Sequence, residues 1–265
     1  MRKTGKAERQ DLILAELRIN RSIRVTELAE KFQTSAETIR RDLDELQATE
    51  RLDRTHGGAR FLPMGHEPSV FERGRLHLSE RRQIGARMVQ LLNANDVVMM
   101  DTGTTTLEVA RAISTGSLPL TIITNSFAIA SALGANSSIR VIIPPGDFSA
   151  IDAEVNGFET HEFIRRFNAN VCIIGSSGIT ENAPVDANSN AVWLKRAMLS
   201  RALRTFLIAD HSKFGRYALQ TVCPWDSINA IVTDRQPAPE FQEIFKFHGI
   251  EVIVAAGDHE TAPDV

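Results

Sequence analysis

Three short amphipathic patterns occupy the first sixty residues. Apolar residues three and four positions apart predict a helix over 11–18. Thr26 and Ser35, residue types favoured as N-caps, are predicted to begin a second and a third helix. Each helix has one apolar stripe, which is predicted to face inward. The inward residues are Ile13, Leu14, Leu17, Leu28, Ala29, Phe32, Ile39, Leu43 and Leu46.

The outward face of the third helix carries Ala36, Glu37, Thr38, Arg40 and Arg41 in its first two turns. A helix that enters the major groove needs small and hydrogen-bonding residues near its start, and arginines that reach phosphates or guanine edges. The helix N-terminus itself also favours a phosphate. The face therefore indicates DNA binding, with a solvated face and a stray arginine pair as the alternative.

A basic turn follows the third helix. Gly57 and Gly58 lie between basic residues in 51–60, which predicts a small β-hairpin whose tip lies along a DNA backbone. An ordinary basic loop is the alternative. Residues 1–60 carry 13 Lys and Arg against 11 Asp and Glu, whereas the whole chain has a net charge of -3. This difference favours a polyanionic partner for the first part only weakly.

Four motifs in this part are Arg9-Gln-Asp-Leu-Ile13, Val25-Thr-Glu-Leu-Ala-Glu-Lys-Phe32, Ser35-Ala-Glu-Thr-Ile-Arg-Arg-Asp-Leu43 and His56-Gly-Gly-Ala59. Together they resemble the N-terminal domain of the DeoR family of bacterial transcription regulators. The resemblance implies a winged helix-turn-helix, with 24–43 as its helix-turn-helix and 51–60 as its wing. The residues expected to contact operator DNA are Thr26, Ser35, Ala36, Glu37, Thr38, Arg40, Arg41, Arg54, His56, Gly57 and Gly58.

A connector and a larger domain follow. Pro63, Gly65, Pro68 and Gly74 interrupt any period in 61–75. Apolar runs then alternate with helical patterns, which predicts an α/β domain whose mostly parallel sheet is flanked by helices. The predicted divisions are 1–60, 61–75 and 76–265. The predicted strands are 97–100, 120–124, 140–143, 171–174, 206–209, 230–233 and 252–254. The predicted helices are 80–92, which is expected to bury Ile84, Met88 and Leu91, then 105–113, 127–134, 159–167, 190–203 and 238–247.

Polar turns stand at the carboxyl ends of five predicted strands, at 101–106, 125–126, 144–147, 175–178 and 210–213. In open α/β sheets ligands bind outside these ends, so a parallel sheet would gather the turns on one rim. In the first turn, Gly103 permits close backbone approach, and the hydroxyl and N–H groups at a helix start suit a phosphate. The alternatives are helix caps and plain turns.

The larger domain extends the resemblance through five motifs: Asp101-Thr-Gly-Thr-Thr-Thr-Leu107, Ile123-Thr-Asn-Ser126, Gly175-Ser-Ser-Gly-Ile179, Leu194-Lys-Arg-Ala-Met198 and Ala209-Asp-His-Ser-Lys-Phe-Gly215. They resemble the DeoR effector domain, which is similar in fold to ribose-5-phosphate isomerase and binds phosphorylated sugars or related metabolites. The stretch 180–190 departs from the family pattern, which leaves the ligand's identity open. The implied effector contacts are Asp101, Thr102, Gly103, Thr104, Thr105, Thr106, Asn125, Ser126, Gly175, Ser176, Ser177, Gly178, Lys195 and Lys213.

The composition limits the function classes. The chain has 265 residues, 43% hydrophobic, and no apolar run of the ~18 residues that a membrane span needs. Cys172 and Cys223 are predicted to be reduced, buried thiols of a cytoplasmic protein. Within these limits, the resemblance implies a homo-oligomeric regulator, most often a repressor of a carbohydrate-utilisation operon, with no cofactor, metal or catalytic residue expected.

Two alternatives stay open. A sugar-phosphate isomerase-like enzyme with an appended DNA module has Asp101, Glu181 and Asp210 as candidate carboxylates, but 175–180 holds no acid. A regulator that oligomerises without binding a sugar is the other.

Overall fold

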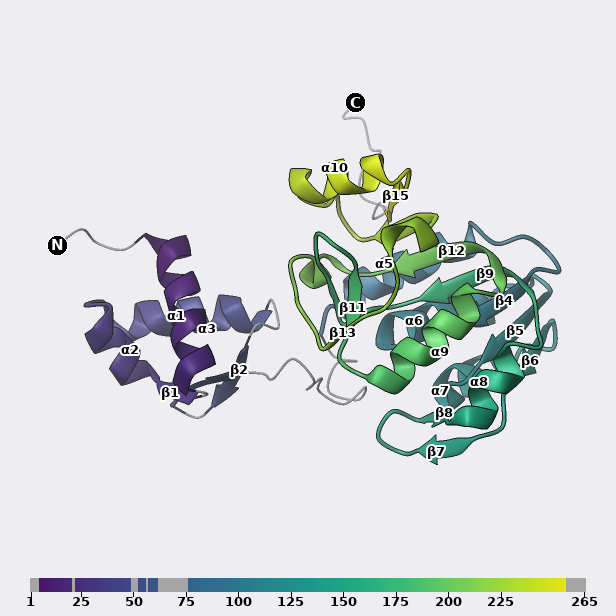
Figure 1. The fold of residues 1–265 in the computed structure, drawn as a ribbon, viewed down its shortest axis with the longest axis horizontal. Coiled ribbons are helices and arrows are strands. Elements are labelled where there is room, and N and C mark those ends of the chain that lie inside the picture. The colour runs from purple at the N-terminus through teal and green to yellow at the C-terminus, as the bar shows by residue number, and fades with distance from the viewer. Residues whose placement is uncertain (1–4, 21, 49–51, 56, 62–75, 256–265) are drawn as a thin grey trace, which may run out of the picture. The chain divides into compact units, whose positions relative to one another are not determined.

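The computed structural model of the chain describes residues 5–20, 22–48, 52–55, 57–61 and 76–255. The chain divides into two units, Met1–His66 and Glu67–Val265, and the ribbon of each is drawn in Figure 1. The predicted connector lies outside the described residues except for Phe61, and so does the predicted DNA contact His56.

The first unit combines three helices with a small antiparallel sheet. The helices are α1 (Lys6–Asn20), α2 (Val25–Lys31) and α3 (Ala36–Ala48). In the sheet, β3 (Gly58–Phe61) lies between β1 (Ser22–Arg24) and β2 (Leu52–Thr55); the β2–β3 hairpin confirms the prediction from the Gly-Gly turn, whereas β1 was not predicted. The predicted inward residues of the three helices are buried in one core, except that Ala29 and Phe32 are only partly buried.

The start of α2 differs from the prediction. Arg24, not Thr26, is the N-cap, and Thr26 is exposed in the first turn. The reason is tertiary: Arg24 pairs with Gly58 in the sheet, and the Val25 N–H donates to the Gly57 carbonyl at 2.9 Å. Ser35 does cap α3 as predicted, because its Oγ accepts the Thr38 N–H at 3.1 Å.

A buried ion pair joins α1 to α3. The Arg9 guanidinium donates to both carboxylate oxygens of Asp42, from Nε at 2.5 Å and from Nη2 at 3.1 Å. Asp42 is only 2% exposed. Its hydrogen bond raises the pKa of Arg9. Because the pair is bidentate and largely out of water, it sets the register of the two helices.

The second unit is built on a seven-stranded sheet in which every pairing is parallel. Its strand order is β15-β14-β12-β9-β4-β5-β6. The strands are β4 (Val97–Met100), β5 (Leu120–Thr124), β6 (Ile139–Ile142), β9 (Ala169–Ile174), β12 (Ala202–Ile208), β14 (Ala230–Thr233) and β15 (Glu251–Val254). This sheet confirms the predicted α/β class.

Helices cover both faces of the sheet, because successive side chains of a strand point to opposite sides. Met99 packs with α8 (Phe158–Ile164), α9 (Ser189–Leu199) and α10 (Pro239–Phe247). Its neighbours Val98 and Met100 pack with α5 (Leu78–Val89), α6 (Thr104–Ser114) and α7 (Phe127–Leu133). Figure 1 shows α8 and α9 in front of the sheet and α5 and α6 behind it.

Two helix details differ from the prediction. The helix predicted over 190–203 ends at Leu199, because Ala202 pairs with Ala169 and opens β12. The helix predicted over 80–92 ends at Val89, and just beyond it Leu92 is buried whereas Leu91 is only partly buried.

The hydrophobic pattern did not predict several short elements. They are the hairpin of β7 (Asp147–Ser149) and β8 (Glu154–Asn156), the small antiparallel sheet of β10 (Gly178–Ile179), β11 (Pro184–Asp186) and β13 (Gln220–Thr221), and the 3-10 turns η1 (His211–Lys213) and η2 (Trp225–Ser227). Strands of two or three residues are too short to show an alternating pattern. No helix in the described part of the chain combines the length and the apolar character that crossing a membrane requires.

The Arg9–Asp42 pair generates a prediction for stability. Arg9→Ala leaves the Asp42 carboxylate buried without its cation, and we expect it to destabilise the first unit by about 3 kcal/mol. In urea the helical circular dichroism signal should therefore fall earlier. The unfolding transition followed by tryptophan fluorescence should be the same as in the parent, because Trp193 and Trp225 both lie in the second unit.

Lys6→Ala is the control for this variant, because Lys6 pairs with Glu45 on the same two helices at an exposed site. Exposed pairs contribute at most about 1 kcal/mol. Equal losses in the two variants would contradict a special role for the buried pair.

Candidate functional site

The candidate site lies where the strand order of the sheet reverses. From β4 the chain first adds β5 and β6 on one side, and then β9 and β12 on the other. A crevice outside the carboxyl ends of the strands forms at such a switch point. Asp101 follows β4 and Gly175 follows β9, and these two strands are neighbours. The turns after β4, β5, β9 and β12 thus share one edge, as predicted.

A buried lysine joins two aspartates at this edge. The Lys195 Nζ lies 3.3 Å from Asp101 Oδ2 and also pairs with Asp186 Oδ2. Asp101 is 2% exposed and Lys195 is 3% exposed. The Gly175 N–H donates to Asp101 Oδ2 at 3.0 Å. The predicted residues Asp101, Gly175 and Lys195 are therefore in contact, and Asp186 is a partner that the sequence did not indicate.

Burial and charge act in opposite directions on the two aspartates. Burial raises the pKa of Asp101 to about 7, although the Lys195 charge and the Gly175 hydrogen bond pull it down. For Asp186, burial also raises the pKa, but the charge and hydrogen bond of Lys195 outweigh it and leave the pKa lowered. The other Asp101 oxygen, Oδ1, is buried with no hydrogen-bond partner within the described ranges. It is an acceptor available to a ligand.

The threonine turn leads into α6, for which Gly103 is the N-cap. The first N–H groups of a helix have no intrahelical partner, so Thr104, Thr105 and Thr106 present donors to an anion. The Thr106 hydroxyl is engaged, since it donates to the Gly103 carbonyl at 3.0 Å. The available donors in this turn are thus mainly backbone groups.

Asn125 and Ser126 serve the protein's own structure as well. Thr102 Oγ1 donates to Asn125 Oδ1 at 3.1 Å, and Asn125 Nδ2 donates to Glu154 Oε2 at 3.3 Å. Ser126 Oγ accepts the Ile129 N–H at 3.3 Å and caps α7. Asn125 therefore ties the threonine turn to β8, where the buried Glu154 had no sequence signal.

The serine-glycine turn divides into two parts. A Cβ at Gly178 would stand 2.2 Å from the Arg216 carbonyl oxygen, so the neighbouring backbone requires glycine there. Ser177 Oγ donates to Asp186 Oδ1 at 3.2 Å. Gly175 borders open space, and the buried Ser176 Oγ has no hydrogen-bond partner among the residues described. Only Gly175 and Ser176 are thus left for a ligand.

Lys213 belongs to a second cluster, at the end of β12. Asp210 is fully buried there and lies 3.2 Å from Arg81 Nε. Burial raises the pKa of Asp210, but the charges of Lys213 and Arg81 and the hydrogen bond from Ser212 leave it lowered. Arg81 had no sequence signal, because an arginine on a helix is usually a surface charge.

A polar pocket of about 550 Å³ lies between the β7–β8 hairpin and the starts of α8 and α9. Glu154 Oε1 accepts from Asn156 Nδ2 at 2.6 Å, which links the pocket to Asn125. Asn156 Oδ1 and His161 Nε2 are buried atoms without a hydrogen-bond partner in the part of the chain that the structure covers. Ligand pockets commonly span about 300–1,000 Å³, so a small metabolite fits. The lining residues are Asp147, Phe148, Ser149, Asp152, Asn156, Gly157, Phe158, His161, Asn188 and Asn190.

In the first unit, α3 presents the arginines that were predicted to contact DNA. Arg40 and Arg41 are 55% and 77% exposed and lie 3.5 and 3.7 Å from Glu37. Such exposed pairs are weak, so they hold neither guanidinium group firmly. Ser35 and Glu37 are also exposed, while Ala36 and Thr38 are partly covered.

The hairpin residues have clear structural roles. A Cβ at Gly58 would stand 2.0 Å from the Ile23 carbonyl oxygen, so the β1–β3 pairing requires glycine. Arg54 donates to the Gly58 carbonyl at 3.3 Å and lies 3.2 Å from Asp44 Oδ1. Arg54 thus fastens the hairpin to α3, and the exposed Gly57 forms its tip.

Known proteins match both units. Residues 9–63 match the family model described as the DeoR-like helix-turn-helix domain, and residues 76–235 match the DeoR C terminal sensor domain. The glycerol-3-phosphate regulon repressor of Escherichia coli (strain K12) is 30% identical over 227 residues, which cover 85% of this chain and 90% of that protein. The L-fucose operon activator of Haemophilus influenzae is 30% identical over 248 residues, which cover 93% of this chain and 99% of that protein.

Among solved structures, the ribose 5-phosphate isomerase A of Methanocaldococcus jannaschii superimposes with a TM-score of 0.40. It is 12% identical, and the match covers 52% of this chain and 55% of the isomerase. Nothing about function follows from a similarity of that degree.

The buried Asp101 generates a pH prediction. Its pKa is about 7 when folded against 3.8 normally, so the folded chain holds a proton that the unfolded chain releases. Stability from this proton is present at low pH and is lost as pH rises from about 4 to about 7. Asp101→Asn removes the effect. The variant should therefore gain stability relative to the parent across that window, by up to about 4 kcal/mol.

Urea unfolding followed by tryptophan fluorescence at several pH values measures this difference. Parallel stability curves for parent and variant would contradict the raised pKa of Asp101.

Proposed function

The chain belongs to the DeoR family of transcriptional regulators, and from that premise we propose that it represses a carbohydrate-utilisation operon and responds to a phosphorylated sugar. Its relatives bear the names of regulators, and it is a DNA-binding regulator rather than an enzyme. We favour repression over activation of transcription, although one of the two relatives described is an activator. The observation that carries the proposal is the meeting of the α6 N-terminus with the Asp101–Lys195 pair at one sheet edge.

The phosphate group would bind at the start of α6. The N–H groups of Thr104, Thr105 and Thr106 and the helix dipole favour a negative charge there. Lys195 is already neutralised by two carboxylates, so its charge is shared with Asp101 and Asp186. A phosphate close to Asp101 further favours the protonated carboxyl, which fits a group whose pKa is about 7.

The sugar hydroxyls would bind beside the phosphate. Asp101 Oδ1 and Ser176 Oγ are buried polar atoms without partners among the described residues, and hydroxyl groups satisfy such atoms. The pocket that Asn156 lines is linked to this edge through the hydrogen bond of Asn156 to Glu154 and that of Glu154 to Asn125.

The effector would act by shifting a population. A sugar phosphate that binds the DNA-free state more tightly lowers the operator affinity by the ratio of its two affinities. A tenfold effect requires a difference of about 1.4 kcal/mol, which a few hydrogen bonds to a phosphate supply. The stretch 180–190, which includes Asp186, departs from the family pattern, so the sugar part of the effector is not assigned.

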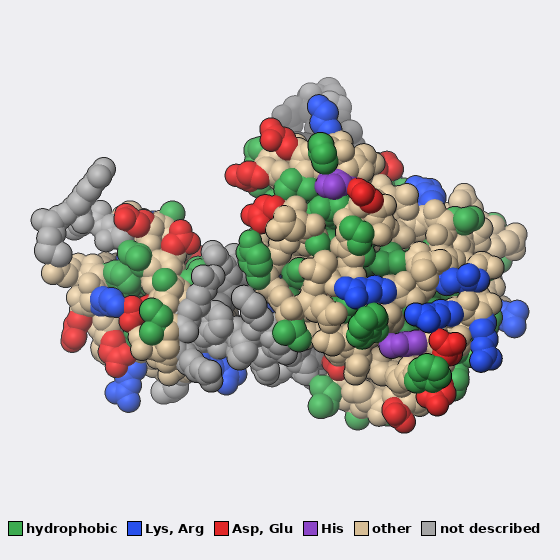
Figure 2. All heavy atoms as spheres, viewed as in Figure 1, with side chains coloured by type: hydrophobic (Ala, Val, Ile, Leu, Met, Phe, Trp, Pro, Cys, Tyr) green, Lys and Arg blue, Asp and Glu red, His purple; other side chains and the backbone are tan. Residues whose placement is uncertain are grey.

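We also propose that the protein works as a homo-oligomer in the cytoplasm, where operator DNA is found. A dimer would place two recognition helices on a palindromic or repeated operator. Large apolar side chains that the second unit leaves exposed support a protein–protein surface, among them Trp193, Leu203 and Leu219. Figure 2 shows hydrophobic side chains among charged ones on the visible surface of this unit.

Operator binding tests the first half of the proposal. Arg40→Ala and Arg41→Ala should each weaken binding to the DNA upstream of the gene, because each removes a cation from the recognition helix. A lost phosphate contact reduces the slope of log affinity against log salt by about 0.9. Gel retardation or fluorescence anisotropy at several salt concentrations measures both quantities.

Arg165→Ala is the matched control, since Arg165 forms a similar exposed pair with Glu162 on α8 of the second unit. Unchanged affinity and slope in both α3 variants would refute the assignment.

Effector response tests the second half. Gly103→Val should abolish the effect of sugar phosphates on the DNA complex while operator binding stays intact, because the added side chain crowds Thr106 and the N–H groups of the α6 start. Gly116→Val, just beyond the other end of the same helix, is the control and should respond normally. A Gly103→Val protein that still responds fully would exclude the threonine turn as the phosphate site.

A further inference from the structure

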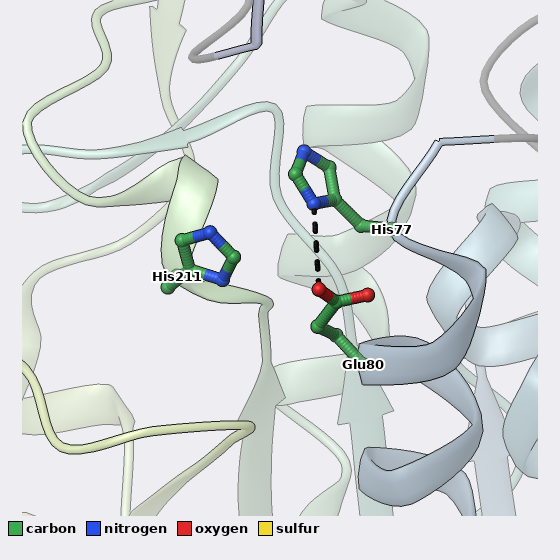
Figure 3. Close-up of side chains that lie close together, drawn as sticks. All are labelled: His77, Glu80 and His211. Carbon is green, nitrogen blue, oxygen red and sulfur yellow. Dashed lines mark ion pairs between the residues drawn. The ribbon is translucent and has the colours of Figure 1, made fainter.

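Three potential metal ligands converge beside the end of β12. His77 precedes α5, Glu80 lies in its first turn, and His211 opens η1. One donor atom from each residue lies within 4.8 Å of the others. His77 Nδ1 and Glu80 Oε1 are 3.9 Å apart. Figure 3 shows the three side chains directed into one space, and all three are partly buried.

The two residues of the first segment are placed for joint binding. His77 and Glu80 are three positions apart at the start of a helix, so they lie on one side of it. His77 has φ 50 and ψ 36, a left-handed conformation that residues other than glycine adopt rarely. Its ring packs edge-on against His211, with ring centroids 5.1 Å apart.

Asp234 orients His211 from the other side. His211 Nδ1 lies 2.8 Å from Asp234 Oδ2, and the His211 N–H donates to Asp234 Oδ1 at 2.7 Å. A histidine that binds a metal usually donates its second ring N–H to a carboxylate in this way, which fixes its tautomer. Nε2 of His211 then remains as the metal-binding nitrogen.

We propose that His77, Glu80 and His211 bind a borderline divalent ion such as Zn²⁺. Two imidazoles and one carboxylate are a common zinc set, and the fourth position is left for water or another ligand. Nitrogen donors disfavour Mg²⁺ and Ca²⁺. Tetrahedral bonds of about 2.0–2.1 Å place ligand atoms about 3.4 Å apart. Side-chain rotations that move these atoms by about 1 Å therefore bring them to bonding distance of one ion.

The surrounding charges permit a cation. The nearby cations Arg81 and Lys213 face the buried Asp210, and Arg235 pairs with Asp234. Glu80 stands in the first turn of α5 and offsets the positive end of that helix. The bound ion would clamp the start of α5 to the turn after β12. This site does not depend on the proposed function.

Titration of the full chain after treatment with a chelator tests the proposal. Calorimetry should show saturable binding of Zn²⁺ at one ion per chain, and Co²⁺ should give the visible absorption of a tetrahedral site. At a hundredfold excess over Kd, the bound ion should raise Tm by about 5 °C or more. Glu80→Gln, which preserves side-chain shape, and His77→Gln should each lower the affinity at least tenfold. Asp234→Asn should lower it about 10–100-fold.

His248→Gln is the matched control. His248 also contacts a carboxylate, Asp226 Oδ1 at 2.7 Å, but belongs to no group of three donors among the residues described. Circular dichroism of each metal-free variant establishes that it is folded. No saturable binding by the parent, or affinity unchanged in the Glu80→Gln and His77→Gln proteins, would overturn the site.

Discussion

The parallel register of the seven-stranded sheet is the constraint on which the rest of the structure depends. Because all strands run the same way, the residue after each strand arrives at the same edge. Asp101, Asn125 and Gly175 are separated by up to 74 positions in the chain, and yet hydrogen bonds join the turn after β4 to both of the others there: Asp101 accepts from Gly175, and Thr102 donates to Asn125. The same register brings Asp210 to that edge, where it pairs with Arg81, 129 positions earlier.

The site contains several buried charged groups, and burying them costs free energy. Asp101, Asp186 and Lys195 are all nearly inaccessible, as are Asp210 and Arg81. Taking such groups out of water is expensive, and mutual attraction does no more than offset it when the geometry is good. The raised pKa of Asp101 shows where the compensation is incomplete. The polar atoms left without partners nearby, Asp101 Oδ1 and Ser176 Oγ, mark the same place. A polar ligand that binds there would stabilise the buried Asp101 and supply hydrogen-bond partners to these atoms.

In the first unit, a few specific contacts fix the positions of the three helices and the hairpin. Its apolar core holds α1, α2 and α3 together, and the bidentate Arg9–Asp42 pair adds direction to a contact that hydrophobic packing alone would leave free to slide. Gly58 allows β1 to approach β3, and Arg54 fastens the hairpin to α3. The side of α3 that carries the exposed Arg40 and Arg41 lies outside this core, which suits a surface that exchanges water for DNA.

Local pattern determined much of this protein by itself. The spacing of Ile39, Leu43 and Leu46 and the Ser35 cap predicted α3, and the apolar runs predicted the strands of the sheet, because both signals lie within a few residues of chain. Only the tertiary structure decided the start of α2, the partners of Asp101 and the positions of Glu154 and Arg81. These depend on backbone pairing and burial between distant segments. A single polar residue carries no sign of a partner that lies a hundred positions away.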